Sequence, residues 1–403
     1  MIILVLNCGS SSLKYQVLDM RSDNDYSLLA KGLVERIGEQ MGIYNHQLPG
    51  KEKYSVEKPV PNHTVGISKV LELLTDKSLG VISSLKEIEA VGHRVAHGGE
   101  YFSGSAAIDD EAISKIEKCA ELAPLHNPAN LLGIRAVQSL MPDIPQVAVF
   151  DTSFHQTIPD YAYMYAIPYE YYQKYKIRRY GFHGTSHKYV AKKACNFVGM
   201  DISHSKIITC HLGNGSSITA IKNGRSIDTS MGFTPMEGLV MGTRSGTVDA
   251  GVVTFLEEKE NLKASDINAL LNKKSGLLGI SQVSSDMRDI ESGAGSGNAN
   301  AALAQEMLFY GIRKFIGAYS AAMGGLDLIV FTGGIGENSS ITREQACEGL
   351  EFLGVEFDKD VNRAVRGKDV VLSTPSSRVK VVAVTTNEEL VIAQDTMNIV
   401  KNK

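Results

Sequence analysis

The chain has 403 residues, of which 43% are hydrophobic and 21% charged, and its net charge is −4. These are the values of an ordinary globular protein, and the length favours two or three domains. A negative net charge gives the chain no general attraction for nucleic acid or anionic lipid, so any anion site must be built locally. No hydrophobic run approaches a membrane span and none reads as a signal peptide, which predicts no membrane partner and a cytoplasmic location.

The cysteines are scattered and form no Cys-x-x-Cys motif. This spacing predicts reduced thiols, with neither a zinc site nor a disulfide framework. The five residues are Cys8, Cys119, Cys195, Cys210 and Cys347.

The N-terminal segment predicts a β-hairpin whose turn suits an anion. Residues 7–14 read Asn-Cys-Gly-Ser-Ser-Ser-Leu-Lys and lie between two apolar, strand-like runs. Gly9 lets the backbone approach a ligand closely, and the serines offer N–H groups and hydroxyls to phosphate oxygens. Lys14 adds a positive charge, and the Asn7 amide could hold the water shell of a metal. The alternative is an ordinary polar turn, and the P-loop spacing is absent.

A second strand–turn–strand segment of the same kind occurs at 207–220, with a Gly-Asn-Gly-Ser-Ser turn. Its repetition about half a chain later suggests two duplicated domains that face each other across a nucleotide. The buried, strand-like runs at 147–152 and 328–334 both end in polar loops and are expected to be a further matching pair. The Asn223-Gly224 pair predicts another hairpin.

Strand and helix patterns alternate through the first half, which predicts an α/β protein. Helical periodicity begins near Val65, and Asp109 caps a second helix. Asn127 is expected to be the N-cap of a third helix, because proline follows it at the first helical position. A buried strand follows at 147–150.

The second half continues the alternation from about residue 151. We expect Thr185 or Ser186 to cap a helix, and a long helix to span 299–323. Two glycine-rich segments, 293–297 and 333–338, are expected to be a flexible turn and a loop ahead of a helix.

Two arginines lie in glycine-rich loops, Arg94 ahead of Gly98-Gly99 and Arg244 within 242–246. A guanidinium exposed by glycine can hold a carboxylate or a phosphate with two hydrogen bonds. The alternative for each is a solvated arginine or a structural salt bridge.

Three further side chains have a functional and a structural interpretation. His183, at a helix start, could present a cationic donor to a phosphoryl group or be a core histidine. Asp151 ends a buried strand and could orient a metal-bound water, pair with an arginine or cap a turn. Glu388 at a helix start could equally be an ordinary partner of the helix dipole.

Six segments resemble the acetate kinase family, in the family's order, over nearly the whole chain: 7–14, 93–99, 182–187, 211–217, 331–338 and 386–389. The resemblance implies two duplicated ribonuclease H-like domains, as in actin and the heat-shock chaperone ATPase, with a nucleotide cleft between them. The domains would be 1–150 and 151–386, with the C-terminal helix 387–403 returning to the first. The implied reaction is reversible phosphoryl transfer from ATP to acetate, giving acetyl phosphate and ADP, in a homodimer.

The resemblance also assigns catalytic roles. Arg94 would bind the acetate carboxylate, Arg244 and His183 would stabilise the transferring phosphoryl group, and Asp151 would be the essential carboxylate near the metal. Acetate is already an anion at neutral pH, so the reaction needs positioning and charge neutralisation but no general base.

The cofactor residues follow in the same way. Asn7 and Glu388 would hold Mg²⁺, for which Mn²⁺ could substitute, through direct or water contacts. The residues around ATP or ADP would be Lys14, His211, Leu212, Gly213, Asn214, Gly215, Asp286, Met287, Arg288, Gly334, Ile335, Gly336, Glu337 and Asn338.

The acyl group would occupy a pocket of Ala96, Leu125, Phe182 and Pro235. The family often has valine where this chain has Ala96, and the smaller residue leaves room for a longer acid. Propionate kinase is therefore an alternative to acetate kinase. A non-catalytic, actin-like ATP-binding protein is a further alternative, but it would not need an arginine beside an apolar pocket.

Overall fold

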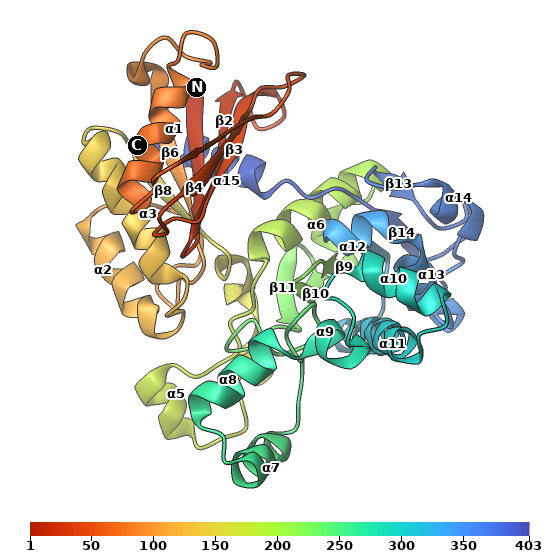
Figure 1. Cartoon of the computed structure of the whole chain (residues 1–403). Helices are drawn as coiled ribbons and strands as arrows, with labels where there is room; N and C mark the ends of the chain where they lie inside the picture. The colour runs from red at the N-terminus through yellow and green to blue at the C-terminus, as the bar shows by residue number, and fades with distance from the viewer. Residues whose placement is uncertain (403) are drawn as a thin grey trace. The chain divides into compact units, whose positions relative to one another are not determined.

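The structure is a computed structural model that describes residues 1–402. It divides into two compact units, each built on its own β-sheet (Figure 1). Unit 1 contains Met1–Phe154 and the chain from Asn387 onward, and unit 2 contains His155–Thr386. Among the described residues, no helix combines the length and apolar character needed to cross a membrane.

The sheet of unit 1 has eight strands in the order β5-β4-β3-β2-β1-β6-β8-β7. The strands β1 to β5 form an antiparallel meander, whereas β1, β6 and β8 are parallel. The strand bounds are β1 (Ile2–Cys8), β2 (Ser12–Met20), β3 (Tyr26–Glu35), β4 (Gly42–Gln47), β5 (Tyr54–Lys58), β6 (Ile88–Val95), β7 (Ala106–Ala107) and β8 (Gln146–Phe150).

Four helices of unit 1 cover this sheet because each has an apolar face to bury. They are α1 (His63–Leu74), α2 (Asp110–Lys118), α3 (Asn127–Leu140) and the C-terminal α15 (Glu388–Lys401). The helix α15 packs so closely on β6 that a Cβ atom on Gly92 would lie 2.4 Å from Oγ1 of Thr396. Glycine at this position therefore allows the end of the chain to rest on the central strands.

The sheet of unit 2 has six strands in the order β11-β10-β9-β12-β14-β13. Its strands are β9 (Lys206–Leu212), β10 (Ser216–Lys222), β11 (Arg225–Thr229), β12 (Leu328–Thr332), β13 (Val370–Val371) and β14 (Lys380–Ala383). Its helices are α4 (Asp160–Tyr163), α5 (Tyr169–Tyr175), α6 (Gly184–Val198), α7 (Ala250–Glu260), α8 (Ala264–Lys273), α9 (Gly276–Ser281), α10 (Met287–Gly295), α11 (Ala299–Met323), α12 (Gly333–Asn338), α13 (Ser340–Cys347) and α14 (Lys359–Ala364).

The two sheets share one strand order. The series β3-β2-β1-β6-β8 corresponds to β11-β10-β9-β12-β14, with the first three strands antiparallel and the last three parallel in both. The expected duplication of a ribonuclease H-like α/β core is therefore confirmed. The expected match of 147–152 with 328–334 is wrong, because β8 corresponds to β14 and β12 corresponds to β6. Composition could not separate these strands, since central parallel strands are buried on both faces and all read as apolar runs.

Both glycine–serine hairpins, the Asn223-Gly224 turn and the helix at 299–323 are confirmed. Two predicted helix caps are wrong. The N-cap of α3 is His126, and the buried side chain of Asn127 instead accepts from the backbone N–H of His97 at 3.1 Å and donates to its carbonyl at 2.9 Å. The N-cap of α6 is His183, with φ of 55°, so Thr185 and Ser186 lie in the first turn.

Two glycine-rich segments are more helical than expected. Residues 293–295 are the last turn of α10, which Asp286 caps by accepting from the N–H of Arg288. The segment 333–338 is the short helix α12 itself. In both cases the cost of glycine in a helix is offset by the packing of the unit.

Candidate active site

Arg94 and Asp151 form the charged centre of unit 1. They lie at the ends of the neighbouring parallel strands β6 and β8, the edge of an α/β sheet where ligands bind. Both carboxylate oxygens of Asp151 accept from Arg94, and Nη1 of Arg94 also donates to Oδ1 of Asn7 at 3.3 Å. The Asp151 side chain is only 2% exposed and that of Arg94 26%, so the guanidinium is the accessible member of the pair. The negative charge of Asp151 raises the pKa of Arg94.

Two asparagines of α3 hold the loop that follows Arg94. Asn130 accepts from the backbone N–H of Ala96 at 3.0 Å and donates to the carbonyl of Cys8 at 2.7 Å. Asn127 bonds both backbone groups of His97. The loop after β6 is thereby tied to the first hairpin, which fixes the direction in which Arg94 leaves the sheet.

Glu388 adds a second, half-buried carboxylate to unit 1. Burial and the charge of Asp151 raise its pKa to about 7, while Arg94 and Lys14 oppose the shift. The main cause of the shift is desolvation and the second is the charge of Asp151, and a divalent cation beside the carboxylates would oppose both. Oxygen donors such as Asn7, Asp151 and Glu388 are of the kind that Mg²⁺ prefers, and Mg²⁺ often keeps several waters. The described residues contain no group of three or more His, Cys, Asp or Glu side chains that could hold a metal ion, so such binding would rely on amide, water or substrate oxygens.

The glycine–serine turn of unit 1 is closed by a hydrogen bond of 2.8 Å from Gly9 N–H to the carbonyl of Ser12, and Ser10 and Ser11 are exposed. Lys14 makes an ion pair with Glu389 at the start of α15. The ammonium group of Lys14 is therefore paired with a carboxylate of its own unit.

The four residues of the expected acyl pocket are divided between the units. In unit 1, Ala96 is buried, whereas Leu125 is 69% exposed. In unit 2, Phe182 packs with Met231 and Met241 in a small apolar cluster, and the carbonyl of Pro235 accepts from Nη1 of Arg244 at 3.2 Å.

His183 and Arg244 approach the same glycine in unit 2. A Cβ atom on Gly215 would lie 3.5 Å from Nε2 of His183 and 3.6 Å from Nη1 of Arg244. Burial lowers the pKa of Arg244, but a guanidinium remains charged at neutral pH. The turn between β9 and β10 therefore has an imidazole and a guanidinium beside its backbone.

Three further histidines surround His183. Its ring stacks on that of His211 with centroids 4.3 Å apart. The ring of His187 is its next neighbour, and His155 in turn lies against His187. Burial lowers the pKa values of His155 and His211 to about 4, and that of His187 well below its ordinary value. These three rings are therefore neutral at pH 7.

The loop that carries Pro235 is held by a polar network that the sequence did not reveal. Nη1 of Arg179 donates to the carbonyls of residues 229, 230 and 231, and its Nη2 to Glu237 at 2.7 Å. The hydroxyl of Tyr165 donates to Glu237 and accepts from the N–H of Phe233 at 2.9 Å. No local pattern identifies these residues, because the chain brings them together only on folding.

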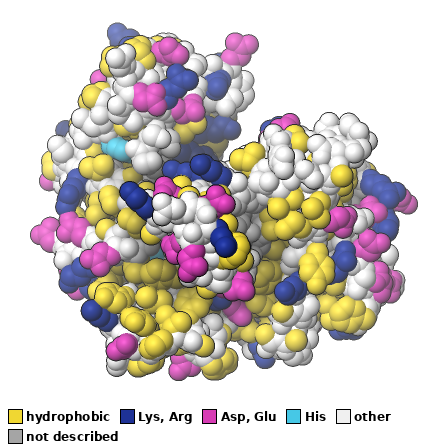
Figure 2. All heavy atoms as spheres, turned by 60° about the horizontal axis from the view of Figure 1, so that its bottom comes forward, with side chains coloured by type: hydrophobic (Ala, Val, Ile, Leu, Met, Phe, Trp, Pro, Cys, Tyr) yellow, Lys and Arg dark blue, Asp and Glu magenta, His cyan; other side chains and the backbone are white. Residues whose placement is uncertain are grey.

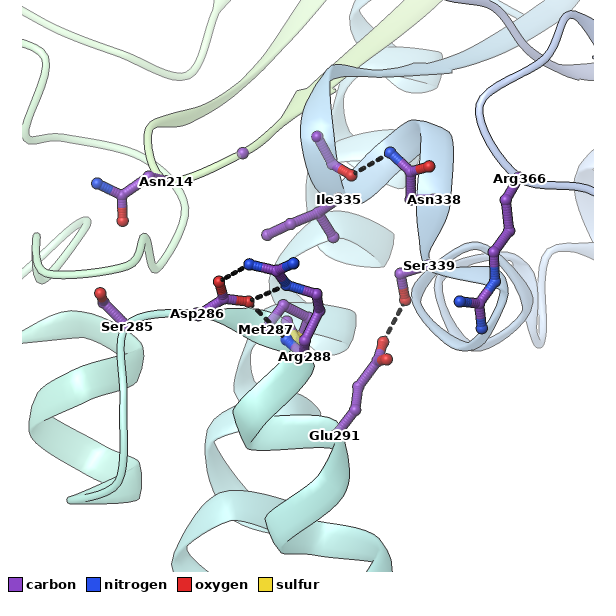
Figure 3. Close-up of a pocket in the computed structure, with 12 residues that line it drawn as sticks. Asn214, Ser285, Asp286, Met287, Arg288, Glu291, Ile335, Asn338, Ser339 and Arg366 are labelled. Atoms are coloured by element: carbon purple, nitrogen blue, oxygen red, sulfur yellow. Dashed lines mark hydrogen bonds and ion pairs between the residues drawn. The ribbon is translucent and has the colours of Figure 1, made fainter. Parts of the chain in front are cut away.

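A pocket of about 660 Å³ lies in unit 2. Figure 3 shows the guanidinium of Arg288 folded onto the carboxylate of Asp286, with Ile335 pointing toward it. The lining residues are Gly213, Asn214, Ser285, Asp286, Met287, Arg288, Glu291, Gly334, Ile335, Asn338, Ser339 and Arg366. Glycines and backbone amides on one side and an apolar Ile–Met wall on another suit a ligand with both phosphates and a flat ring.

Most of the residues expected to bind the nucleotide line this pocket, but some do not. Leu212 is in the core, and Nδ1 of His211 bonds the Ser186 hydroxyl at 2.8 Å. Oε1 of Glu337 accepts from the backbone N–H groups of Gly333 and Thr386, so it ties α12 to the segment that follows β14. Gly215 and Gly336 do not line the pocket either, and Lys14 belongs to unit 1. The lining residues that sequence reasoning missed are Ser285, Glu291, Ser339 and Arg366.

A duplicated ribonuclease H-like core with a glycine-lined pocket is an architecture that suits a phosphotransferase of the two-domain α/β class. The chain belongs to the acetokinase family, whose model matches residues 2–394. It is 61% identical over 400 residues to the acetate kinase of Caldanaerobacter subterraneus subsp. tengcongensis, covering 99% of each chain. It is 58% identical to that of Carboxydothermus hydrogenoformans, covering all of both chains.

Solved structures agree with these relatives. The crystal structure of Porphyromonas gingivalis acetate kinase matches with a TM-score of 0.96 at 53% identity, covering 99% of each chain. A propionate kinase from Francisella tularensis matches with a TM-score of 0.91 at 41% identity, again over 99% of each chain.

Proposed function

We propose that this chain is an acetate kinase that transfers the terminal phosphoryl group of ATP directly and reversibly to acetate. The observation that carries the proposal is the approach of His183 and Arg244 to Gly215. Gly215 directly follows Gly213 and Asn214, which line the 660 Å³ pocket, so two basic side chains lie at the end of a nucleotide-sized site. Phosphoryl transfer requires mainly this kind of positioning and charge stabilisation.

Each unit supplies part of the chemistry. In unit 1, Asp151 and Asn7 hold the guanidinium plane of Arg94, which binds the acetate carboxylate. In unit 2, Arg244 and His183 donate to the equatorial oxygens of the phosphoryl group as charge develops on them. The acetate oxygen attacks as an anion, so no residue needs to remove a proton.

Asn7 and Glu388, with Asp151 nearby, would hold Mg²⁺ directly or through water. When bound, the ion neutralises phosphate charge and so reduces the repulsion between the two anionic substrates. A cation beside the half-buried carboxylate of Glu388 would offset the burial and the charge of Asp151 that raise its pKa.

The test is acyl phosphate formation by the purified chain from ATP, Mg²⁺ and acetate, trapped with hydroxylamine. We expect acetyl phosphate and ADP in equal amounts, and ATP formation in the reverse direction. ATP hydrolysis without acyl phosphate, or no reaction with any short carboxylate, would overturn the proposal.

Propionate kinase is the second candidate. Ala96 is smaller than the valine that the family resemblance leads us to expect there, and the chain is similar to a propionate kinase over 99% of its length. A comparison of kcat/KM for acetate, propionate and butyrate separates the two candidates, since the preferred acid has the highest value.

We also propose that the chain works as a homodimer in the cytoplasm. The helix α7 buries none of its residues. Val252 and Phe255 lie three positions apart on one exposed face of it, and the exposed Val248 precedes its N-cap. Figure 2 shows hydrophobic and charged side chains interspersed on the face that comes forward when the bottom of Figure 1 is turned toward the viewer. We expect sedimentation to give a dimer, and the Phe255→Glu variant to shift it toward monomer; a monomer at all concentrations would refute this.

Five buried, free thiols support the proposed cytoplasmic location, because the cytoplasm keeps thiols reduced.

A further inference from the structure

A hydrogen-bonded chain of four side chains leads from the interior of unit 2 to His183. Oγ1 of Thr209 bonds Nδ1 of His187 at 2.7 Å, and Nε2 of His187 bonds Oγ of Ser217 at 2.8 Å. The same Ser217 oxygen bonds Nδ1 of His183 at 2.9 Å. Thr209, His187 and Ser217 are fully buried on β9, α6 and β10.

The hydrogens of this chain have two head-to-tail directions. A third arrangement, in which Ser217 accepts from both rings, would leave the hydrogen of its fully buried hydroxyl without an acceptor. A neutral imidazole has one N–H and one acceptor nitrogen, and a hydroxyl has one hydrogen to donate. In the outward direction, Thr209 donates to His187, His187 donates to Ser217, and Ser217 donates to Nδ1 of His183. In the inward direction, every donor and acceptor exchanges roles, and His183 donates from Nδ1.

Thr209 decides between the two directions. Its hydroxyl has no other hydrogen-bond partner within residues 1–402, and it is fully buried. In the inward direction its hydrogen would have no acceptor, which is unfavourable for a buried donor. In the outward direction every hydrogen in the chain is used, and the single N–H of a neutral His183 is on Nε2.

We propose that Ser217, with Thr209 behind it, is a positioning residue that sets the tautomer of His183, so that the neutral ring presents an Nε2–H donor beside Gly215 and Arg244. The neutral state of His187, which burial and the neighbouring His155 and His211 favour, is consistent with the chain. The ionisable groups near the His183 ring include His187, His211, which stacks on it, and Arg244. The role in the reaction rests on the proposed function, because that function places the phosphoryl group beside Nε2.

The outward direction is testable without any substrate. In the full chain labelled with ¹⁵N-histidine, two-bond ¹H–¹⁵N correlations distinguish the Nε2–H tautomer, the Nδ1–H tautomer and the imidazolium. Variants with His183→Asn and His187→Asn assign the two rings. We expect both rings to be Nε2–H tautomers at pH 7.5. An Nδ1–H form or an imidazolium at His183 would overturn the proposal.

Variants then test the role of the chain in the reaction. Thr209→Val removes the donor at the buried end with little change of volume, and Ser217→Ala removes the link to His183. We expect an Nδ1–H population of His183 in Thr209→Val, and kcat lowered roughly 5- to 10-fold in both variants, which is about the effect of one hydrogen bond. The KM values for ATP and acetate should change less than about twofold. Thr209→Ser keeps the hydroxyl and should restore both tautomer and kcat.

Thr219→Val is the matched control. It also removes a buried hydroxyl from the same sheet, but that hydroxyl bonds Oγ1 of Thr229 at 2.8 Å and no histidine. Its spectra and kcat should equal those of the unmodified chain. If Thr209→Val and Ser217→Ala match this control in kcat, the positioning role is refuted even with the expected tautomers. If the unmodified chain forms no acyl phosphate, the proposed function fails, while the tautomers still test the chain of hydrogen bonds.

Discussion

Arg94 makes three side-chain hydrogen bonds within unit 1, to Asp151 and Asn7. At the scale of single residues, this explains why arginine is needed: its planar fork can engage a buried carboxylate and still present another edge to a ligand, which a lysine cannot do. Removing the guanidinium would also leave Asp151, only 2% exposed, without its counter-charge.

Arg94→Ala should impair use of the acid far more than use of ATP. One charge-assisted contact is worth roughly 1.5–3 kcal/mol, so kcat/KM for acetate should fall at least about 10- to 100-fold. The KM for ATP should change little, because the nucleotide pocket belongs to unit 2. Arg135→Ala is the control, since Arg135 pairs with Glu117 on the surface. Normal steady-state constants for acetate in Arg94→Ala would contradict the assignment.

Ala96→Val should narrow the acyl pocket. Ala96 is 3% exposed and its N–H is held by Asn130, so the backbone cannot easily move to accept two more carbons. One methylene discriminates by about 1–3 kcal/mol in such a pocket. We expect kcat/KM for propionate to fall relative to acetate when the two acids are compared in both proteins. An equal or higher propionate-to-acetate ratio in Ala96→Val would show that position 96 does not set acyl length.

At the scale of elements, the loop between β11 and α7 is held from inside by side chains. Arg179 bonds three successive carbonyls, and Glu237 connects Arg179 to Tyr165. The loop then presents the Pro235 carbonyl to Arg244. An irregular segment can position a catalytic group in this way because its polar groups are satisfied within the unit.

Tyr165→Phe should therefore make the position of the Arg244 side chain less well defined, although Tyr165 does not bond Arg244 itself. The variant loses the bonds to Glu237 and to the N–H of Phe233, and we expect kcat to fall roughly 5- to 30-fold, with the KM for ATP nearly unchanged. Steady-state kinetics with saturating ATP measure the effect. Tyr161→Phe is the control because Tyr161 is 86% exposed. Identical kcat values in the two variants would count against a positioning role for the loop network.

At the scale of the whole molecule, each unit contains a buried neutral histidine outside the proposed chemistry. His93 bonds Gln146 at 2.8 Å in unit 1, and His155 bonds Ser226 and the Phe182 carbonyl in unit 2. Burial lowers the pKa of both from an ordinary 6.5 to about 4. The unfolded chain takes up protons at these sites below about pH 6.5, whereas the folded chain does so only near pH 4. Each of these histidines therefore contributes a loss of stability to its unit as the pH falls through this window. In unit 1 this loss opposes the gain from Glu388, because its pKa is raised to about 7.

The free energy of unfolding should fall by about 1.4 kcal/mol per pH unit for each such histidine, or about 2 kcal/mol between pH 6.5 and 5. His93→Gln should lower stability at pH 7 but reduce the slope of the unit 1 transition. Urea titrations at pH 7, 6 and 5 measure the slopes. The control His204→Gln changes a histidine that is 82% exposed and should keep the original slope. Parallel slopes in all three proteins would contradict the prediction.

Local patterns in the sequence determined the repeated glycine–serine hairpins, the long helix α11, the α/β class and the motifs that carry the family resemblance. They did so because hairpin turns, helix periodicity and buried strands each depend on residues close in the chain. The same patterns placed Asp151 and Arg94 at strand ends, where α/β sheets bind ligands.

Only the tertiary structure decided which of these residues meet. Arg94 and Asp151 are 57 residues apart, His183 and Ser217 are 34 apart, and Tyr165 and Glu237 are 72 apart. Hydrogen bonds over such separations depend on strand order and helix packing, which no local pattern encodes. The match of the duplicated strands and the state of 333–338 were predicted wrongly for the same reason. Burial in the folded units, and not propensity, selected the final arrangement.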